Sequence, residues 1–451
     1  MNSDGLPGCS RHAERVAALA AALHEGDGRV ALGKDTSNLF RDRDAEARRR
    51  LDVRSLTEVL EVDPVQGTVD AEGMVPYEKL ADACLTHGVM PAVVPQLKTI
   101  TLGGAVAGVG IEATSFRAGL VHEAVEELEV LTGDGRVLTC TAANEHADLF
   151  FGFPNSYGTL GYALRVKSRT LPVKPFVRVE HQPFDDARPY FAAVERACAD
   201  RAADFIDGTM FAPDRLYLTL ATFADAAPYT SDYSFEHIYY RSIAERRQDW
   251  LTARDYLWRW DTDWFWCSKN LLAQNPLVRR LYGRAHLGSR TYTKIMRWNS
   301  RVGLTRTLDR WRGVHGESVI QDVDVPIEHA PEFLEFLART IGIWPVWMCP
   351  IGPRCHAARF TLYPMEERWY VNFGFWDVVR RREAHERGHF NRLIEREVAR
   401  LGGIKSLYSE SFFTREEFDA AYGGREYRAL KAKYDPGGRF PALYDKVVLR
   451  E

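Results

Sequence analysis

The sequence lacks an excess of charge of either sign. Its 59 Lys and Arg residues stand against 62 Asp and Glu residues, which gives a formal net charge of −3. Proteins that bind nucleic acid carry a basic surface that neutralises phosphates, so we expect no nucleic-acid partner. With 451 residues, of which 45% are hydrophobic, the chain is long enough for two or three globular domains.

Cysteine patterns that hold metals or build disulfide frameworks are also missing. The seven cysteines are scattered, with no CxxC pair and no histidine spacing that suits zinc. An odd and scattered set of cysteines is typical of reduced thiols. We therefore expect no metal site and a cytoplasmic location.

Long apolar runs are absent as well. No run reaches the roughly 20 residues that a transmembrane helix needs. Residues 1–27 carry charges where a signal peptide needs an apolar core. Residues 11–24 are instead predicted to form an amphipathic helix.

Three regions of the chain differ in their patterns. In residues 1–175, short strand-like runs alternate with helical segments, and the GDG sequence at 133–135 predicts a hairpin turn. Residues 176–400 have longer helical stretches and most of the tryptophans, which predicts a second domain with a large apolar surface. Residues 401–451 contain short helices, turns and five tyrosines, and we expect this segment to return to a site on the other two regions.

Three loops rich in glycine, serine and threonine follow or precede predicted strands. They are GKDTSNLF (33–40), KTITLGGAVAGVGIE (98–112) and NSYGTLGYALRVK (155–167). Backbone N–H groups and hydroxyls in such loops bind the oxygens of a pyrophosphate. The spacing fits neither GxGxxG in a βαβ unit nor GxxxxGK[ST]. Close packing of a helix on a sheet explains one glycine pair, but three such loops favour a long phosphorylated cofactor.

The order of these segments resembles the FAD-binding domain of the vanillyl-alcohol oxidase and p-cresol methylhydroxylase (PCMH) superfamily. Within residues 58–172 the likeness is to Δ24-sterol reductase, in the motifs EVLEVDP, TLGGAVAGVGIEATSFRAGL, LTGDGRVLTCT and DLFFGFPNSYGTLGYALRVK. It continues through YYRSI, VIQDVDVPI, WPVWMCP, LYSESFFTREEF and LYDK. The middle segment DYLWRWDTDWFWCSKNLLAQNP is closer to bacterial flavoproteins of 10-methyl-branched or furan fatty acid synthesis.

This resemblance implies an α+β fold, with a PCMH-type FAD-binding domain at 1–175, a substrate-binding cap domain at 176–400 and a C-terminal segment at 401–451 that returns to the flavin. It implies FAD, which we expect to be non-covalent because the segment IEATSFRAGL offers neither His nor Cys and His122 is the nearest candidate for a covalent link. We expect NADPH or another electron donor or acceptor to complete the reaction. The residues assigned to the cofactor are Lys34, Thr36, Ser37, Asn38, Thr99, Thr101, Gly103, Gly104, Gly108, Gly110, Ile111, Ser156, Gly158, Thr159 and Gly161.

The resemblance also implies chemistry at a C–C bond of a long lipid chain. Reduction of a methylene branch to a methyl branch on a phospholipid-linked acyl chain is the first choice. Dehydrogenation of a methyl-branched chain in furan fatty acid synthesis, a Δ24-sterol reductase-like reaction and oxidation of a small alcohol stay open. A flavin-binding or lipid-binding protein without catalysis is a more distant alternative.

Reduction of an isolated alkene needs an acid in an apolar, aromatic pocket, where burial raises the pKa of a carboxylic acid and ring faces stabilise cationic character. Asp261 lies in the aromatic stretch YLWRWDTDWFWC, and Glu112 directly follows the glycines. Tyr408 and Glu410 in LYSES are further candidates. Each has a plainer explanation: core packing of the tryptophans, an ion pair between Glu112 and Arg117, and solvation of residues 408 and 410.

No acidic residue lies between Asp263 and Asp309, where nine basic residues are mixed with aromatic and aliphatic ones. A solvated basic face or an internal anion site is one interpretation. The other is a peripheral contact with an anionic bilayer, which attracts such segments. On this second interpretation we expect a peripheral location at the inner face of the membrane.

Overall fold

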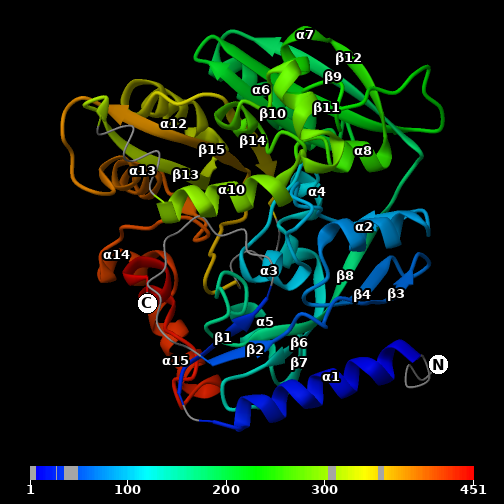
Figure 1. Cartoon of the computed structure of the whole chain (residues 1–451), viewed down its shortest axis with the longest axis vertical. Coiled ribbons are helices and arrows are strands. Elements are labelled where there is room, and N and C mark those ends of the chain that lie inside the picture. Colours follow the sequence, from blue (N-terminus) through cyan, green and yellow to red (C-terminus); the bar gives the residue numbers. More distant parts are fainter. Residues whose placement is uncertain (1–6, 27, 35–48, 303–310, 354–359, 451) are drawn as a thin grey trace.

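Two large antiparallel sheets dominate the computed structural model, which describes residues 7–26, 28–34, 49–302, 311–353 and 360–450. One sheet forms the upper half of Figure 1 and the other lies in the lower half. Helices cover both sheets, so the predicted α+β fold class is confirmed. Among the described residues, no helix combines the length and the apolar character that crossing a bilayer requires.

The lower sheet is built from strands before residue 175. Its strand order is β3 (Val59–Asp63), β4 (Thr68–Glu72), β8 (Tyr162–Pro172), β6 (Val125–Leu131) and β7 (Val137–Thr141), with β5 (Val89–Pro91) also paired to β8. The predicted GDG hairpin joins β6 to β7, which pair from Leu131 opposite Val137. Helices α2 (Tyr77–Leu85), α3 (Leu102–Ala107), α4 (Ser115–Ala118) and α5 (Ala147–Gly152) and the 3-10 helix η2 (Val121–Ala124) complete this half.

Helix α3 approaches β8 closely because of a glycine. A Cβ at Gly103 would lie 2.9 Å from the carbonyl oxygen of Gly73 and 3.1 Å from the Cβ of Ala163 on β8. The Gly103 N–H donates to that same Gly73 oxygen at 2.8 Å. A larger side chain would therefore push the glycine segment away from the sheet.

The predicted N-terminal helix is confirmed as α1 (Pro7–His24), which lies along the bottom of the molecule in Figure 1. Leu19 and Leu23 pack into a small core with Tyr162 and Phe440. The two-stranded sheet of β1 (Val30–Gly33) and β2 (Arg49–Asp52) joins this core. The helix thus supports the strand that leads to the predicted loop 33–38.

An ionic cluster fastens α1 to the lower sheet. His12 is buried, with Nδ1 2.9 Å from Glu72 Oε1 and Nε2 3.0 Å from Glu129 Oε1. Arg15 donates to the same Glu72 oxygen at 2.6 Å. Burial alone lowers the pKa of His12, but the hydrogen bonds and charges of the two carboxylates outweigh it and raise the pKa from 6.5 to about 9.

The raised pKa predicts a pH-dependent stability. Because the folded pKa exceeds the unfolded one, the stabilisation is complete below about pH 6.5 and is lost as the pH rises through 9. His12→Gln should lower the free energy of unfolding at pH 6.5 by about 2 to 3 kcal/mol, and the gap from the unmodified protein should shrink at pH 10. Chemical denaturation at both pH values measures this, with the exposed His87→Gln as control. A gap that is independent of pH would contradict the assignment.

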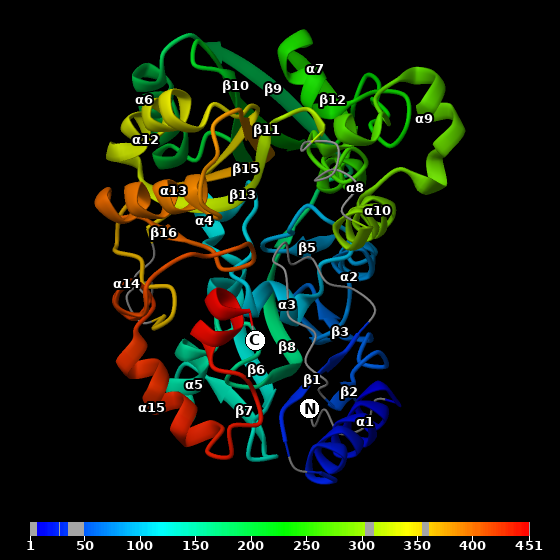
Figure 2. The same cartoon turned by 60° about the vertical axis from the view of Figure 1, so that its left-hand side comes forward.

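The upper sheet has eight antiparallel strands. Their order is β12 (Gln248–Thr252), β9 (Phe176–Phe184), β11 (Arg215–Ala224), β10 (Phe205–Ala212), β14 (Val346–Ile351), β15 (Tyr370–Arg381), β13 (His315–Pro326) and β16 (Ile404–Lys405). The longer predicted helices α6 (Ala187–Ala199), α12 (Ala330–Phe336) and α13 (His389–Arg400) pack on one face through a shared apolar core. The opposite face is turned toward the lower half (Figure 2).

The chain passes from the lower to the upper sheet at the predicted domain limit and returns to the lower half in its C-terminal segment. Strand β8 ends at Pro172 and β9 begins at Phe176, so the limit at residue 175 falls in the short link between the sheets. After β16, helices α14 (Arg415–Ala421) and α15 (Gly424–Tyr434) and the π-helix η8 (Asp445–Leu449) return to the lower half. There Lys431 donates to the Thr159 carbonyl at 2.7 Å, and Lys446 donates to the Tyr157 carbonyl at 2.6 Å.

Candidate flavin and substrate site

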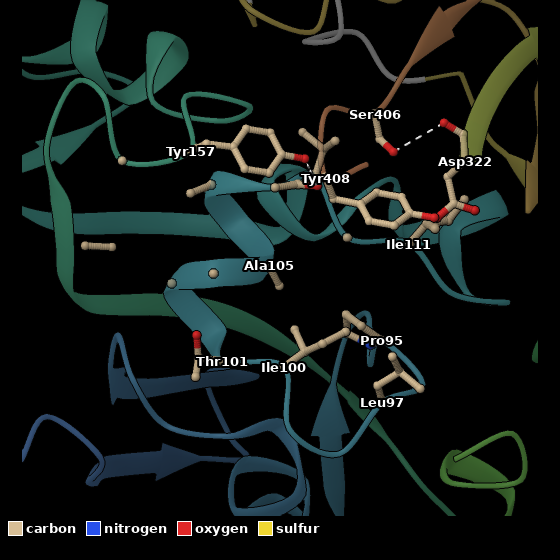
Figure 3. Close-up of a pocket in the computed structure, with 18 of the residues that line it drawn as sticks. Pro95, Leu97, Ile100, Thr101, Ala105, Ile111, Tyr157, Asp322, Ser406 and Tyr408 are labelled. Atoms are coloured by element: carbon tan, nitrogen blue, oxygen red, sulfur yellow. Dashed lines mark hydrogen bonds between the residues drawn. The ribbon is translucent and has the colours of Figure 1, made fainter. Parts of the chain in front are cut away.

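A cavity of about 320 Å³ lies where the two halves and the C-terminal segment meet. The lower half contributes residues of segments 30–34, 95–111 and 157–163 to its wall. The upper half contributes Asp322, Asp324 and several tryptophans, and the C-terminal segment contributes Ser406 and Tyr408. Figure 3 shows α3, with Thr101 and Ala105, on one side of this space and Asp322, Ser406 and Tyr408 on another. Its size is at the low end for a ligand pocket.

Most of the residues assigned to the cofactor from the sequence line this cavity. They are Lys34, Thr99, Thr101, Gly103, Gly104, Gly108, Gly110, Ile111, Gly158 and Gly161. Ser156 and Thr159 are fully buried beside the wall rather than in it, and the Thr159 hydroxyl donates to the Ser156 carbonyl at 2.8 Å. Thr36, Ser37 and Asn38 lie outside the described residues.

The glycines of α3 have different roles. The N–H groups of Leu102 and Gly103 already donate to the carbonyls of Val75 and Gly73, at 3.0 and 2.8 Å, so they serve packing rather than a phosphate. Gly104 is exposed and lines the cavity. A Cβ at this position would lie 2.7 Å from Thr101 Oγ1. Of the two glycines of α3, Gly104 is therefore the one that presents bare backbone to the cavity.

The polar groups of this wall fit a long phosphorylated cofactor. Gln96 lines the cavity and is buried, and both polar atoms of its amide lack a hydrogen-bond partner among the described residues. A buried amide without a partner is costly in a folded protein, so a ligand that pairs with it would remove that cost. Lys34 and Lys446 also line the cavity and bring positive charge to it. The observed wall suits FAD.

Asp322 is the acidic group at the other end of the cavity. On β13, Val319, Val323 and Val325 face the helices of the upper half. Strand alternation therefore turns Asp322 and Asp324 to the opposite face, where they line the cavity. Gly374 is opposite Asp322 on β15, and a Cβ there would lie 2.7 Å from Asp322 Oδ1.

A hydrogen-bonded chain fixes the Asp322 carboxyl. Trp376 Nε1 donates to the Tyr408 hydroxyl at 3.0 Å, and Tyr408 in turn is hydrogen-bonded to the Asp322 side chain. Because the tyrosine oxygen accepts from the indole, its own hydrogen is left to donate to the carboxyl. Figure 3 shows the ring of Tyr408 turned toward Asp322. Asp322 Oδ1 is buried and has no partner among the described residues. Burial, followed by the charge of Asp324, raises the pKa of Asp322 well above its usual range, which favours the protonated acid.

Asp324, the second acid of the cavity wall, has a hydrogen-bond donor for each of its carboxyl oxygens. Its Oδ1 accepts from Asn372 at 2.7 Å and its Oδ2 accepts from Tyr363 at 2.6 Å. Burial raises its pKa to about 6 in spite of these two bonds. The cavity therefore holds two carboxyl groups with different environments, of which Asp322 has the unpartnered oxygen.

Aromatic side chains form the apolar part of the wall. Phe265 packs on Trp376 at a ring-centroid distance of 4.3 Å and on Trp347 at 5.8 Å. Trp264 also lines the cavity. Trp264 and Phe265 adopt φ values of 45° and 60°, which are unfavourable for bulky residues and are concentrated at functional sites.

Of the four acids proposed from the sequence, Tyr408 lines the cavity and the other three do not. Glu112 is buried behind the wall and accepts from Arg259 at 3.0 Å, whereas its expected partner Arg117 contacts Asp204. Burial raises the pKa of Glu112 to about 7.

Asp261 and Glu410 are also engaged elsewhere. Asp261 accepts from the Ser289 hydroxyl at 2.6 Å and from the Lys98 N–H at 2.9 Å. Glu410 accepts from Arg387 at 2.9 Å. These contacts hold segments together.

Sequence reasoning missed Asp322 and Asp324. The available signal is the DVD sequence at 322–324, in which two acids alternate with valines inside an apolar strand. Such alternation places both acids on the face opposite the valines. His122, the nearest candidate for a covalent flavin link, is buried against Phe360 at a centroid distance of 4.4 Å and does not belong to the cavity wall.

Residues 9–141 match the model of the family described as FAD binding domain. This match, together with the likeness to known reductases and dehydrogenases, identifies the chain as an FAD-dependent oxidoreductase. It is 25% identical to human Delta(24)-sterol reductase over 405 residues, which cover 87% of this chain and 76% of the relative. The enzyme of the same name from Arabidopsis thaliana is 23% identical over 432 residues, covering 88% and 76%.

A shorter match is to Cytokinin dehydrogenase 7 of rice, 30% identical over 144 residues that cover 31% of this chain and 27% of the relative. The predicted resemblance to PCMH-type flavoproteins and to Δ24-sterol reductase is thus confirmed. The likeness to flavoproteins of fatty acid synthesis stays a prediction.

The position of Gly104 predicts the effect of a substitution on flavin binding. Gly104→Leu would project a side chain into the cavity, so we expect FAD affinity to fall by at least about tenfold, the effect of losing roughly 1.4 kcal/mol of binding. Flavin released from the purified protein and measured by absorbance gives the occupancy. Gly437→Leu is the matched control, because Gly437 is exposed and a Cβ there would have no neighbour closer than 4.0 Å. Full flavin content in Gly104→Leu would refute the placement.

Proposed function

We propose that this FAD-dependent oxidoreductase reduces a carbon–carbon double bond of a long-chain lipid, and that a methylene-branched acyl chain is its substrate. The observation that carries the proposal is the Asp322 carboxyl in an aromatic cavity that the glycine segment also lines. The name of the relatives, Delta(24)-sterol reductase, supports reduction of a lipid. The predicted likeness of the segment DYLWRWDTDWFWCSKNLLAQNP to fatty acid flavoproteins is the reason for proposing an acyl chain over a sterol.

The acid needed for such a reduction is supplied by the chain itself. An isolated alkene has no carbonyl that polarises it, so its exposed methylene carbon must accept a proton from a positioned acid. Asp322 lines the cavity, and its carboxyl is hydrogen-bonded to Tyr408 and stands as the proton donor in this proposal. Burial and the charge of Asp324 raise the pKa of Asp322, which favours the protonated form that a general acid needs.

The two hydrogens then account for the product. When bound in this cavity, FAD would supply the hydride, and NADPH or another reductant would be needed to reduce the flavin again. The methylene carbon gains the proton from Asp322 and the tertiary carbon gains the hydride, so the alkene becomes a methyl branch in a two-electron reduction. Trp264, Phe265 and Trp376 surround this space. Their ring faces stabilise positive charge that develops at the tertiary carbon, and their bulk excludes water.

The cofactor is proposed to be non-covalent. The cavity wall formed by the described residues contains neither histidine nor cysteine, which are the side chains expected to tether flavin. Acid precipitation of the purified protein should therefore release a yellow supernatant.

The direction of the reaction is open to a direct test. The purified protein is incubated without oxygen with candidate lipids, and the flavin absorbance is followed before mass spectrometry of the lipid. We expect flavin that has been reduced beforehand to be reoxidised by a methylene-branched lipid, with a mass gain of two hydrogens. Bleaching of oxidised flavin by a methyl-branched lipid would instead indicate dehydrogenation, and reoxidation by a Δ24-sterol alone would indicate a sterol reductase. Either outcome would overturn the proposed substrate reaction.

The identity of the acid gives a second test. Asp322→Asn should retain FAD but slow lipid reduction by about 10² to 10⁴-fold, the usual contribution of a positioned acid. Asp261→Asn alters another buried carboxyl, outside the cavity, and should change the rate by less than about tenfold. In the unmodified enzyme, the rate should fall as the pH rises through the raised pKa of Asp322. A larger loss in Asp261→Asn than in Asp322→Asn would move the acid to the aromatic segment.

A further inference from the structure

Three leucines near α9 (Pro276–Tyr282) are exposed to an unusual degree, and we call Leu272, Leu277 and Leu281 the leucine patch. Their exposed fractions are 68%, 71% and 86%. Trp298 and Trp311, later in the same region, are exposed by 55% and 85%. A group of large apolar side chains on a protein surface marks an interaction site, whereas scattered single ones do not.

Helix α9 holds its leucines outward by means of a buried charge. Asn275 caps the helix by accepting from the N–H of Leu277 at 3.0 Å. Arg279 points inward, is only 6% exposed, and donates to Asp263 at 2.8 Å and to the Phe235 carbonyl at 2.7 Å. Leu277 and Leu281 are four residues apart and so share a face of the helix. The arrangement inverts the usual one, in which leucines are buried and arginines are in water.

Fewer unpaired positive charges remain in this region than the sequence alone indicated. Four of the nine basic residues pair with acids from other parts of the fold: Lys269 with Asp377, Arg279 with Asp263, Arg284 with Asp232 and Arg290 with Glu78. Arg280 and Lys294 are exposed and have no acidic partner within the described residues. The side chains of Arg297, Arg301 and Arg306 lie outside the described residues. The described part of this surface is therefore mainly apolar, and Arg280 and Lys294 add positive charge that complements an anionic partner.

The leucine patch is linked to the cavity through adjacent residues. Asp263, the partner of Arg279, immediately precedes Trp264 of the cavity wall. Trp264 stacks on Tyr292 of α10 (Ser289–Val302) at a centroid distance of 6.3 Å. Figure 2 shows α9 and α10 on the same side of the molecule.

We propose that the leucine patch inserts into the surface of an anionic phospholipid bilayer, with Arg280 and Lys294 at the level of the headgroups. Exposed leucines beside cations suit this interface, which binds both apolar area and positive charge. A second copy of the chain would match the leucines but not the positive border, since like charges would meet. Only the delivery of an acyl chain rests on the proposed function; docking itself is independent of it.

The test uses the full-length protein and vesicles of phosphatidylcholine with phosphatidylglycerol. The unmodified protein should co-sediment with these vesicles at low salt, and less at high salt. The double variant Leu277→Ser/Leu281→Ser should lose at least about tenfold in partitioning, since two apolar side chains no longer insert. Val65→Ser is the matched control, because Val65 is 88% exposed in the turn between β3 and β4, away from the patch. Arg280→Glu/Lys294→Glu should weaken binding and reduce its dependence on salt.

Several results would overturn docking. They are the absence of co-sedimentation at low salt, equal binding by the leucine variant, and a dimer of the unmodified protein that the leucine variant abolishes without a change in vesicle binding. Flavin content and turnover of detergent-dispersed lipid are measured on the same variants. Because the leucines lie outside the cavity, both quantities should stay unchanged, so a failure of docking is separate from a failure of the proposed reaction.

Discussion

The relative position of the two halves of the molecule depends on the ion pairs of one buried arginine. Arg259 donates to Glu112, just after the glycine segment, at 3.0 Å and to Asp207 on β10 at 2.9 Å, and all three residues are almost fully buried. The ring of Tyr256 lies 4.0 Å from the guanidinium, and Asp207 also accepts from Trp347 of the cavity wall. Removing one partner from such a cluster costs about 3 to 5 kcal/mol, because a charge is left buried alone. This ion cluster keeps the flavin segment, the upper sheet and the aromatic wall in register.

The position of the acidic residues in the cavity depends on how the two halves are held together and on the alternation of side chains along β13. With valines turned to the helices, Asp322 and Asp324 must face the space between the halves. The segment after β16 then brings Tyr408 to Asp322 from another direction, while α3 presents Gly104 across the cavity. A polar cofactor region and an apolar reaction region thus share one cavity, in which Gly104 and Asp322 meet although they are more than 200 positions apart in the chain.

Features that depend on local sequence could be predicted. The N-terminal helix, the GDG hairpin, the α+β class and the glycine segment follow from periodicity and turn residues, and motif resemblance added FAD. The acid could not be chosen in this way, because Glu112 and Asp261 look equally suitable until their partners Arg259 and Ser289 are known. The sequence around Asp322 is typical of a strand in the protein core. Its place in a cavity becomes clear only from the structure, in which it lies opposite Gly374 and contacts Tyr408. The number of unpaired basic residues on the surface likewise could not be predicted, because acids far away in the sequence, such as Asp232 and Glu78, pair with some of them.

The central claim is that the reacting lipid and the flavin meet at Asp322. A crystal structure of the protein with FAD and a saturated, methyl-branched acyl analogue tests it most directly. The account predicts flavin against Gly104, and the branch methyl carbon within about 3 to 3.5 Å of the Asp322 carboxyl, the distance of reacting groups before a transfer. A chain bound away from Asp322, with its branch beside Asp261 or Glu112, would contradict the account.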